Sequence, residues 1–215
     1  YHSKIGFYAS MKGNEMENYK FVFDLDSTLT KQEILPEISK CINKYELMQN
    51  LTNETMLGNL SFEESFKKRV DLLKCIPISK VKSIVAKINL NEKIVKFIKE
   101  NPDRCTVVTN NLDIWICDLM KELSLENKYY SSIAHSNGDF IDKIKVIIKK
   151  EDIIKKMKGP IVAVGDGSND IKMIENADIG IGFGGVRPIA PGILKVCDYA
   201  FYEEERLCQL LKQLL

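Results

Sequence analysis

The chain has 215 residues, a formal net charge of +1 from 31 basic and 30 acidic side chains, and 45% hydrophobic residues. This size and composition predict one compact domain with room for a small inserted lobe. The balanced charge argues against a nucleic-acid or membrane-surface partner, and we expect neither. No apolar run is long enough to span a bilayer and no charged-then-apolar leader is visible, so we expect a cytoplasmic protein of unknown oligomeric state.

The first segment with a clear pattern is 20–26, "KFVFDLD", which predicts a buried strand that ends in acid. The residues before it, 1–18, are polar and aperiodic and are expected to form a flexible N-terminal extension. From 31 to 90 the pattern is helical. Three of the expected helices are 61–76 with a capping box of Ser61 and Glu64, 79–88 with Ser79 as cap, and 91–100.

The second half of the chain alternates strands with helices. Strands are expected at 104–110, 129–140 with a turn at Asn137 and Gly138, 160–167, 178–184 and 198–202. Helices are expected at 112–123, 149–159, 168–177 with Ser168 as cap, and 203–215.

Continuous apolar strands that alternate with helices predict a parallel sheet covered on both faces. The expected fold class is therefore α/β, with a Rossmann-like core formed by 19–31 and 92–215. The segment 32–91 is too long for a single crossover, and we expect it to form a small helical cap inserted after the first strand.

Three of the predicted strands end in polar clusters. These are Asp24 and Asp26, then Thr109 and Asn110, and finally Asp166 with Asn169 and Asp170 just beyond it. Because ligands bind at the carboxyl ends of the strands in an open parallel sheet, these clusters are expected to converge on one site.

Carboxylates gathered in one site repel each other, and burying them is costly unless a cation balances their charge. Oxygen ligands favour a hard cation, above all Mg²⁺, and no His/Cys cluster for zinc is present. Mg²⁺ beside a carboxylate nucleophile indicates phosphoryl transfer through an aspartyl-phosphate. In this chemistry Asp24 attacks phosphorus, and Asp26 protonates the leaving oxygen and then deprotonates the attacking water. Thr109 and a lysine balance the charge on the phosphoryl oxygens.

The order of these motifs resembles that of the haloacid dehalogenase superfamily of phosphohydrolases. The resemblance covers about 19–202 and rests on "DLDST" at 24–28, Thr109 at a strand end, a lysine before a helix, and "GDGSND" at 165–170. It implies Asp24 as nucleophile, Asp26 as acid/base, and Mg²⁺ held by Asp24, the main-chain carbonyl of Asp26 and Asp166, with Asp170 in support.

The phosphate-binding lysine of this superfamily is expected in "KKEDII". Members commonly have a lysine, two residues and then an apolar pair, and Lys150 fits this spacing. Lys149, Lys143 and Lys145 are the alternatives.

Two stretches resemble phosphoserine phosphatases more specifically. In "FDLDSTLTKQEILPEI" a glutamate, Glu33, follows the nucleophile by nine residues, and the segment 55–81 is similar to the cap of those enzymes. The resemblance implies that Arg69 pairs with the substrate carboxylate, Glu33 with its ammonium, and that Met56 and Phe62 close over the substrate. The alternatives are helix surface for Arg69 and Glu33, and cap core for Met56 and Phe62.

The chain also departs from those enzymes. Thr109, Asn110 and Asn111 stand where they usually have Ser-Gly-Gly, which keeps a hydroxyl and adds two side chains where backbone normally approaches the substrate. Asn110 and Asn169 are further candidates for substrate contact, with a turn as the alternative role for Asn169. Arg187 follows a later strand, where it either binds an extra anionic group or lies on the surface.

The expected function is that of a Mg²⁺-dependent phosphomonoester hydrolase whose substrate is O-phospho-L-serine. One alternative is a phosphatase or phosphotransferase that acts on another small phosphorylated metabolite. The other is a non-catalytic binding module of the same fold, against which the full set of strand-end carboxylates, Thr109 and Lys150 argues.

Overall fold

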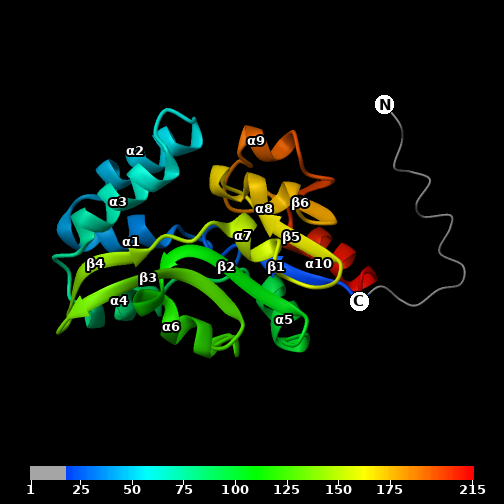
Figure 1. Cartoon of the computed structure of the whole chain (residues 1–215), viewed down its shortest axis with the longest axis horizontal. Coiled ribbons are helices and arrows are strands. Elements are labelled where there is room, and N and C mark those ends of the chain that lie inside the picture. Colours follow the sequence, from blue (N-terminus) through cyan, green and yellow to red (C-terminus); the bar gives the residue numbers. More distant parts are fainter. Residues whose placement is uncertain (1–17) are drawn as a thin grey trace, which may run out of the picture.

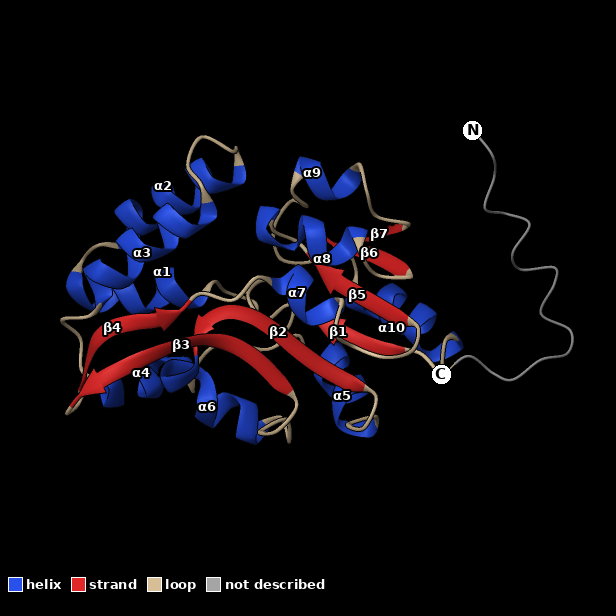
Figure 2. Ribbon diagram, in the orientation of Figure 1, coloured by secondary structure: helices blue, strands red, loops and turns tan. Residues whose placement is uncertain are grey.

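The computed structural model of the chain describes residues 18–215, in which seven strands form one sheet in the order β4-β3-β2-β1-β5-β6-β7 (Figures 1 and 2). Neighbouring strands are parallel, except that β3 and β4 form an antiparallel hairpin. The strands are β1 (Lys20–Phe23), β2 (Cys105–Leu112), β3 (Tyr129–Asn137), β4 (Phe140–Val146), β5 (Ile161–Gly165), β6 (Ile179–Phe183) and β7 (Tyr199–Phe201). The expected α/β fold with a Rossmann-like core is confirmed, whereas the expected extension over 1–18 lies outside the described residues apart from Asn18.

The side chains of the short central strand β1 alternate between two apolar layers. Phe21 and Phe23 pack on one face, where the ring of Phe97 lies 5.1 Å from that of Phe21 at an interplanar angle of 86°. Val22 faces the other layer, which includes Met173. Because both faces of the strand are covered, its three buried residues, Phe21, Val22 and Phe23, are consecutive hydrophobic residues rather than alternating ones.

Helices cover the sheet on both faces (Figure 2). One face carries α5 (Glu92–Glu100), α6 (Asp113–Glu122) and α10 (Glu204–Gln213). The other face carries α7 (Lys150–Ile154), α8 (Ile171–Glu175), which follows the 3₁₀ turn η3 (Ser168–Asp170), and α9 (Pro191–Leu194). The strand order reverses between β1 and β5, which is where an open parallel sheet leaves a crevice for a ligand.

The chain between β1 and α5 folds into further helices, of which α2 and α3 lie above the β3–β4 hairpin in Figure 1. They are α1 (Ile34–Ser39), the 3₁₀ turn η2 (Lys40–Ile42), α2 (Tyr45–Met56), α3 (Phe62–Leu73) and α4 (Ile78–Val85). Ser61 caps α3 as expected, because its hydroxyl accepts the Glu64 N–H at 3.3 Å. The boundaries of the cap, 32–91, and of the core stay a prediction.

The expected cap of α4 is wrong. The helix begins at Ile78, so Ser79 lies inside it, and the Ser79 N–H and hydroxyl donate to the Asp139 carboxylate at 2.9 and 2.5 Å. The Asp139 carbonyl also accepts the Ile78 N–H at 2.7 Å. The hairpin tip thereby satisfies the first free donors of α4, a contact between distant residues that local sequence does not reveal.

Other element boundaries also differ from expectation. The segment 129–140 holds β3 and a two-residue turn and leads into β4. Strand β4 was not expected, because its lysines interrupt the alternation of apolar and polar residues that indicates a strand. The helix expected over 149–159 ends at Ile154, and α9 has only four residues, fewer than periodicity can detect. Gly167 rather than Ser168 holds the cap position of η3.

None of the helices between residues 18 and 215 combines the length and apolar character needed to cross a membrane.

Candidate active site

The carboxyl ends of β1 and β5 bring three carboxylates together where the strand order reverses. The Asp24 N–H donates to the Val164 carbonyl at 2.9 Å, which aligns Asp24 with the end of β5. Asp166 follows β5 directly, and Asp170 ends η3. One carboxylate oxygen from each of the three lies within 4.8 Å of the others, and all three side chains are buried. The structure thus brings these predicted residues together, and such a group of oxygens can hold a metal ion.

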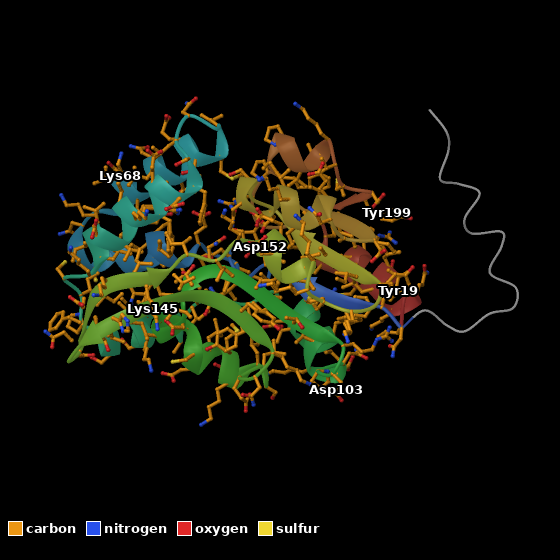
Figure 3. All side chains as sticks on the ribbon, in the orientation of Figure 1. Tyr19, Lys68, Asp103, Lys145, Asp152 and Tyr199 are labelled. Atoms are coloured by element: carbon orange, nitrogen blue, oxygen red, sulfur yellow. The ribbon has the colours of Figure 1, made fainter. Side chains whose placement is uncertain are left out.

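Lys150 balances part of this negative charge. It is 1% exposed, and its Nζ donates to Asp24 Oδ1 at 2.5 Å and to Asp170 Oδ1 at 2.6 Å. Burial lowers the pKa of Lys150, but the Asp170 and Asp24 carboxylates outweigh burial and raise it above its usual value. The three alternative lysines, Lys143, Lys145 and Lys149, are exposed. Lys145, for example, lies on β4 (Figure 3). Among the four, Lys150 therefore has the geometry expected of the phosphate-binding lysine.

The loop after β5 is built around the Asp170 carboxylate. Asp170 Oδ2 accepts the N–H groups of Asp166 at 3.2 Å and Gly167 at 3.0 Å, while its other oxygen binds Lys150. A Cβ placed on Gly165 would lie 2.7 Å from Asp170 Cγ, so only glycine leaves room for this close approach. Asp170 therefore fixes both the loop and the lysine.

Burial perturbs the carboxyl groups strongly. It raises the pKa of Asp24 well above its ordinary value, and the Asp170 charge raises it further against the opposing effect of Lys150. It also raises the pKa of Asp166 to about 7, although the Arg187 guanidinium lowers it. Ionising these buried carboxyl groups is therefore costly unless further positive charge reaches the site.

The interacting charged groups of the site carry more negative than positive charge. The carboxyl groups are Asp24, Asp26, Glu33, Asp166 and Asp170, and the cations are Arg69, Lys150 and Arg187. When all are ionised, these five carboxylates and three cations leave an excess of two negative charges, so a divalent cation fits the donor set in charge as well as in ligand type.

Asp26 follows Asp24 on the same turn and is held at both oxygens. Its Oδ1 accepts the Ile34 N–H at 2.8 Å, and its Oδ2 accepts a hydrogen bond from the Asn111 side-chain amide. Burial raises the pKa of Asp26 to about 6, since it outweighs the Ile34 hydrogen bond. A carboxyl group with this pKa can both donate and accept a proton near neutral pH. The chain turns sharply after it, with Ser27 at a φ of 57°.

The end of β2 places three polar residues beside these carboxylates. Thr109 is fully buried, and its hydroxyl accepts the Asn111 N–H at 3.1 Å. The Asn110 amide is occupied by protein groups, because Nδ2 donates to the Ile148 carbonyl at 2.8 Å and Oδ1 accepts from Asn169 Nδ2 at 3.1 Å. Asn110 and Asn169 thus support each other at the edge of the site.

A pocket extends from Asp24 and Asp26 towards α2 and α3. Its walls include every residue expected to contact the substrate, namely Glu33, Met56, Phe62, Arg69, Asn110 and Asn169, and also Asn111 and Arg187. Thr109, Lys150, Asp166 and Asp170 are not among the residues that line it, and lie deeper.

Arg69 is buried in the wall of this pocket, 8% exposed, whereas its neighbour Lys68 is exposed on α3 (Figure 3). Its described hydrogen bonds go to the Thr52 hydroxyl at 3.2 Å and the Ser65 carbonyl at 3.4 Å, and its guanidinium lies 5.9 Å from the centre of the Phe62 ring. Burial lowers the pKa of Arg69. The helix-surface alternative for Arg69 is wrong.

Glu33 and Arg187 form an ion pair across the pocket. Arg187 Nη1 contacts Glu33 Oε1, and Arg187 Nε contacts Asp166 Oδ2. Burial lowers the pKa of Arg187, but the Asp166 and Glu33 charges outweigh burial and raise it. The surface alternatives for Glu33 and Arg187 are therefore wrong, since their side chains are only 13% and 22% exposed.

Sequence reasoning did not predict that Arg187 pairs with Glu33 and Asp166, or that Asn111 contacts Asp26. Two features of the sequence could have drawn attention to these residues: the arginine in "GFGGVRP", and an asparagine where the enzymes it resembles usually have glycine. The partners of both residues come from distant parts of the chain, 154 residues away for the Arg187–Glu33 pair.

The comparisons with known proteins agree with this geometry. Residues 21–175 match the sequence model of the haloacid dehalogenase-like hydrolases. The phosphoserine phosphatase of Methanocaldococcus jannaschii is 32% identical over 212 residues, which cover 92% of this chain and 98% of that protein. The phosphoserine phosphatase of Archaeoglobus fulgidus is 33% identical over 181 residues, which cover 78% of this chain and 53% of that protein.

Solved structures give the same result. A phospho-aspartyl intermediate analogue of phosphoserine phosphatase superposes with a TM-score of 0.78 at 29% identity and covers 92% of this chain and 99% of the other. A substrate-bound phosphoserine phosphatase complex superposes with a TM-score of 0.76 at 28% identity, covering 94% of this chain and 99% of the other.

Proposed function

The chain belongs to the family of haloacid dehalogenase-like hydrolases, and we propose that it hydrolyses O-phospho-L-serine to L-serine and phosphate. One observation carries the proposal. The pocket has Asp24 and Asp26 at its base and, in its wall, a buried Arg69 whose described hydrogen bonds reach only neutral groups. A small molecule with a phosphate at one end and a carboxylate at the other pairs with both. The cytoplasm stays the predicted compartment.

Mg²⁺ is the proposed cofactor. Asp24, Asp166 and the main-chain carbonyl of Asp26 would hold it, with Asp170 in support. Bound there, it would supply the missing positive charge and stabilise the negative charge on the phosphoryl oxygens.

Asp24 and Asp26 are proposed to carry out the two chemical steps. Lys150 holds Asp24 Oδ1, which leaves Oδ2 to attack phosphorus and form the aspartyl-phosphate. Asp26 protonates the seryl oxygen as it leaves, and then takes a proton from the water that hydrolyses the intermediate. Its pKa of about 6 suits both steps.

The charge on the transferred group is balanced by protein donors. Lys150 lies beside the nucleophile, and the Thr109 hydroxyl, which accepts the Asn111 N–H, has its own O–H to donate to a phosphoryl oxygen. Met56 and Phe62 line the pocket and are proposed to exclude water other than the nucleophile.

A second candidate function has one observation in its favour. Because Arg187 already pairs with Glu33, the pocket also suits a small phosphomonoester without an amino group. Phosphatase or phosphotransferase action on such a metabolite would use the same Asp24 and Asp26.

We expect rapid release of phosphate from O-phospho-L-serine in the presence of Mg²⁺ and loss of this activity in EDTA. The measurement sets kcat/KM for phosphoserine against phosphoethanolamine, phosphoglycolate, glycerol phosphates and an aryl phosphate. Preferred turnover of phosphoserine supports the proposal. Preferred turnover of an ester without an amino group favours the second candidate. Absence of turnover of every ester with Mg²⁺ would contradict both and favour a non-catalytic binding module.

The Arg69→Ala variant should raise KM for phosphoserine roughly 10- to 100-fold, since it removes a charged hydrogen-bonding partner of the substrate carboxylate. For phosphoethanolamine, which has no carboxylate, KM should change little. Lys68→Ala is the matched control, because Lys68 is the exposed neighbour of Arg69 on α3. Equal effects of Arg69→Ala on both substrates would contradict the assigned role.

Mg²⁺ should bind roughly tenfold more tightly at pH 8 than at pH 6. The pKa of Asp166 is raised to about 7, so this carboxyl is largely protonated at pH 6 and must lose its proton to bind the ion, whereas at pH 8 it is ionised. The rise in Tm caused by Mg²⁺, measured against KCl of equal ionic strength, should therefore be larger at pH 8. A rise that is equal at both pH values, or larger at pH 6, would count against Asp166 as a ligand.

A further inference from the structure

The described part of the chain contains four buried side-chain polar atoms without a hydrogen-bond partner: Ser27 Oγ, Glu33 Oε2, Asn111 Oδ1 and Trp115 Nε1. Glu33 and Asn111 line the pocket, whereas the other two residues do not. Their free atoms are both oxygen acceptors. Since a buried acceptor without a partner keeps the full cost of its desolvation, two of them in one pocket indicate a ligand that brings donors.

Neither acceptor can easily turn towards another partner within the protein. Glu33 is fixed through Oε1 by Arg187. Asn111 is fixed in β2 by its N–H, which donates to Thr109 Oγ1, and by Nδ2, which donates to Asp26 Oδ2. Because the ionised Asp26 carboxylate only accepts hydrogen bonds, Asn111 directs its Nδ2 at Asp26, and this orientation leaves Oδ1 free.

The neighbouring residue shows that this arrangement is specific to Asn111. Asn110 has the same amide side chain, but both of its polar atoms are occupied, by the Ile148 carbonyl and by Asn169. Of these two asparagines, only Asn111 combines a contact to Asp26 with an unused acceptor.

The ligand group that matches two fixed acceptors is an ammonium group, which has three donors and no acceptor. One of the acceptors, Glu33, is a carboxylate, which favours a cation over a neutral donor. Arg69 in the same pocket supplies the donors for a carboxylate. The pocket thereby has separate partners for the two charged ends of an amino acid.

We propose that Asn111 is a substrate-positioning residue that accepts a hydrogen bond from the substrate ammonium through Oδ1, beside Glu33 Oε2, and holds Asp26 through Nδ2. The inference rests on the proposed function and adds to it a specificity-determining residue. It links recognition of the amino group to the position of the acid/base carboxyl, because one amide contacts both.

The test compares substrates that differ only in the amino group. One pair is O-phospho-L-serine and 3-phosphooxypropanoate; the other is phosphoethanolamine and ethyl phosphate. In Asn111→Ala the preference in kcat/KM for the amino member of each pair should fall roughly 10- to 100-fold, mainly through KM for that member. The kcat values should fall for both members, because Asp26 loses its partner.

Two further variants separate the roles of Asn111. Asn111→Asp keeps an acceptor but removes the donor to Asp26, so it should retain the amino preference while kcat falls. Asn53→Ala is the control and should leave the amino preference unchanged, because Asn53 is an exposed asparagine on α2 that does not line the pocket. Circular dichroism and turnover of an aryl phosphate establish that each variant is folded.

The outcomes distinguish this inference from the proposed function. If the native protein hydrolyses phosphoserine but Asn111→Ala changes both members of each pair equally, Asn111 acts only through Asp26 and the inference is overturned. If phosphoserine is not a substrate, the proposed function fails, and the pair of phosphoethanolamine and ethyl phosphate still tests Asn111. A native protein without preference for the amino member of either pair also overturns the inference.

Discussion

The structure depends on the burial of carboxylates at the carboxyl ends of β1 and β5. Asp24, Asp166 and Asp170 are held within reach of one another and almost out of contact with water, an arrangement that costs several kcal/mol for each unpaired charge. Lys150 offsets part of this cost by contacting two of them. The remaining excess of negative charge makes the site a receptor for positive charge, and a divalent cation placed there would draw a phosphate group towards the nucleophile.

The surrounding fold maintains this arrangement. The parallel register of β1 and β5 sets the spacing of Asp24 and Asp166, and the tight loop at Gly165 allows Asp170 to bind both backbone and lysine. Helices α2 and α3 supply further wall residues of the pocket, including Arg69. The Ser168 hydroxyl donates to the Thr55 carbonyl at 3.3 Å and so joins the end of α2 to the loop after β5. Residues from distant segments therefore complete a site whose reactive groups follow the strands directly.

Sequence patterns predicted the sheet and the strand-end carboxylates because both follow from local order: an apolar run, then acid, then a helix. They predicted that these strand ends meet, but not which individual hydrogen bonds and ion pairs join distant residues. Ser79 and Ser168 resemble caps locally, but their hydroxyls bind Asp139 and Thr55, which are 60 and 113 residues away. The Asn111 contact with Asp26 and the Arg187 contact with Glu33 also join distant parts of the chain, with separations of 85 and 154 residues. The positions of the strand-end groups, and through the family resemblance those of the expected wall residues, were thus predictable, whereas the partners of Asn111 and Arg187 required the structure.

In the proposed mechanism Asp24 carries the phosphoryl group during turnover. The direct measurement is acid quenching of the enzyme with radiolabelled phosphoserine and Mg²⁺, followed by peptide mapping of the acid-stable, base-labile label. We expect one labelled site, Asp24, with no label in Asp24→Asn and none without Mg²⁺. Label on a different residue, or turnover by Asp24→Asn at a rate close to that of the native enzyme, would contradict this mechanism.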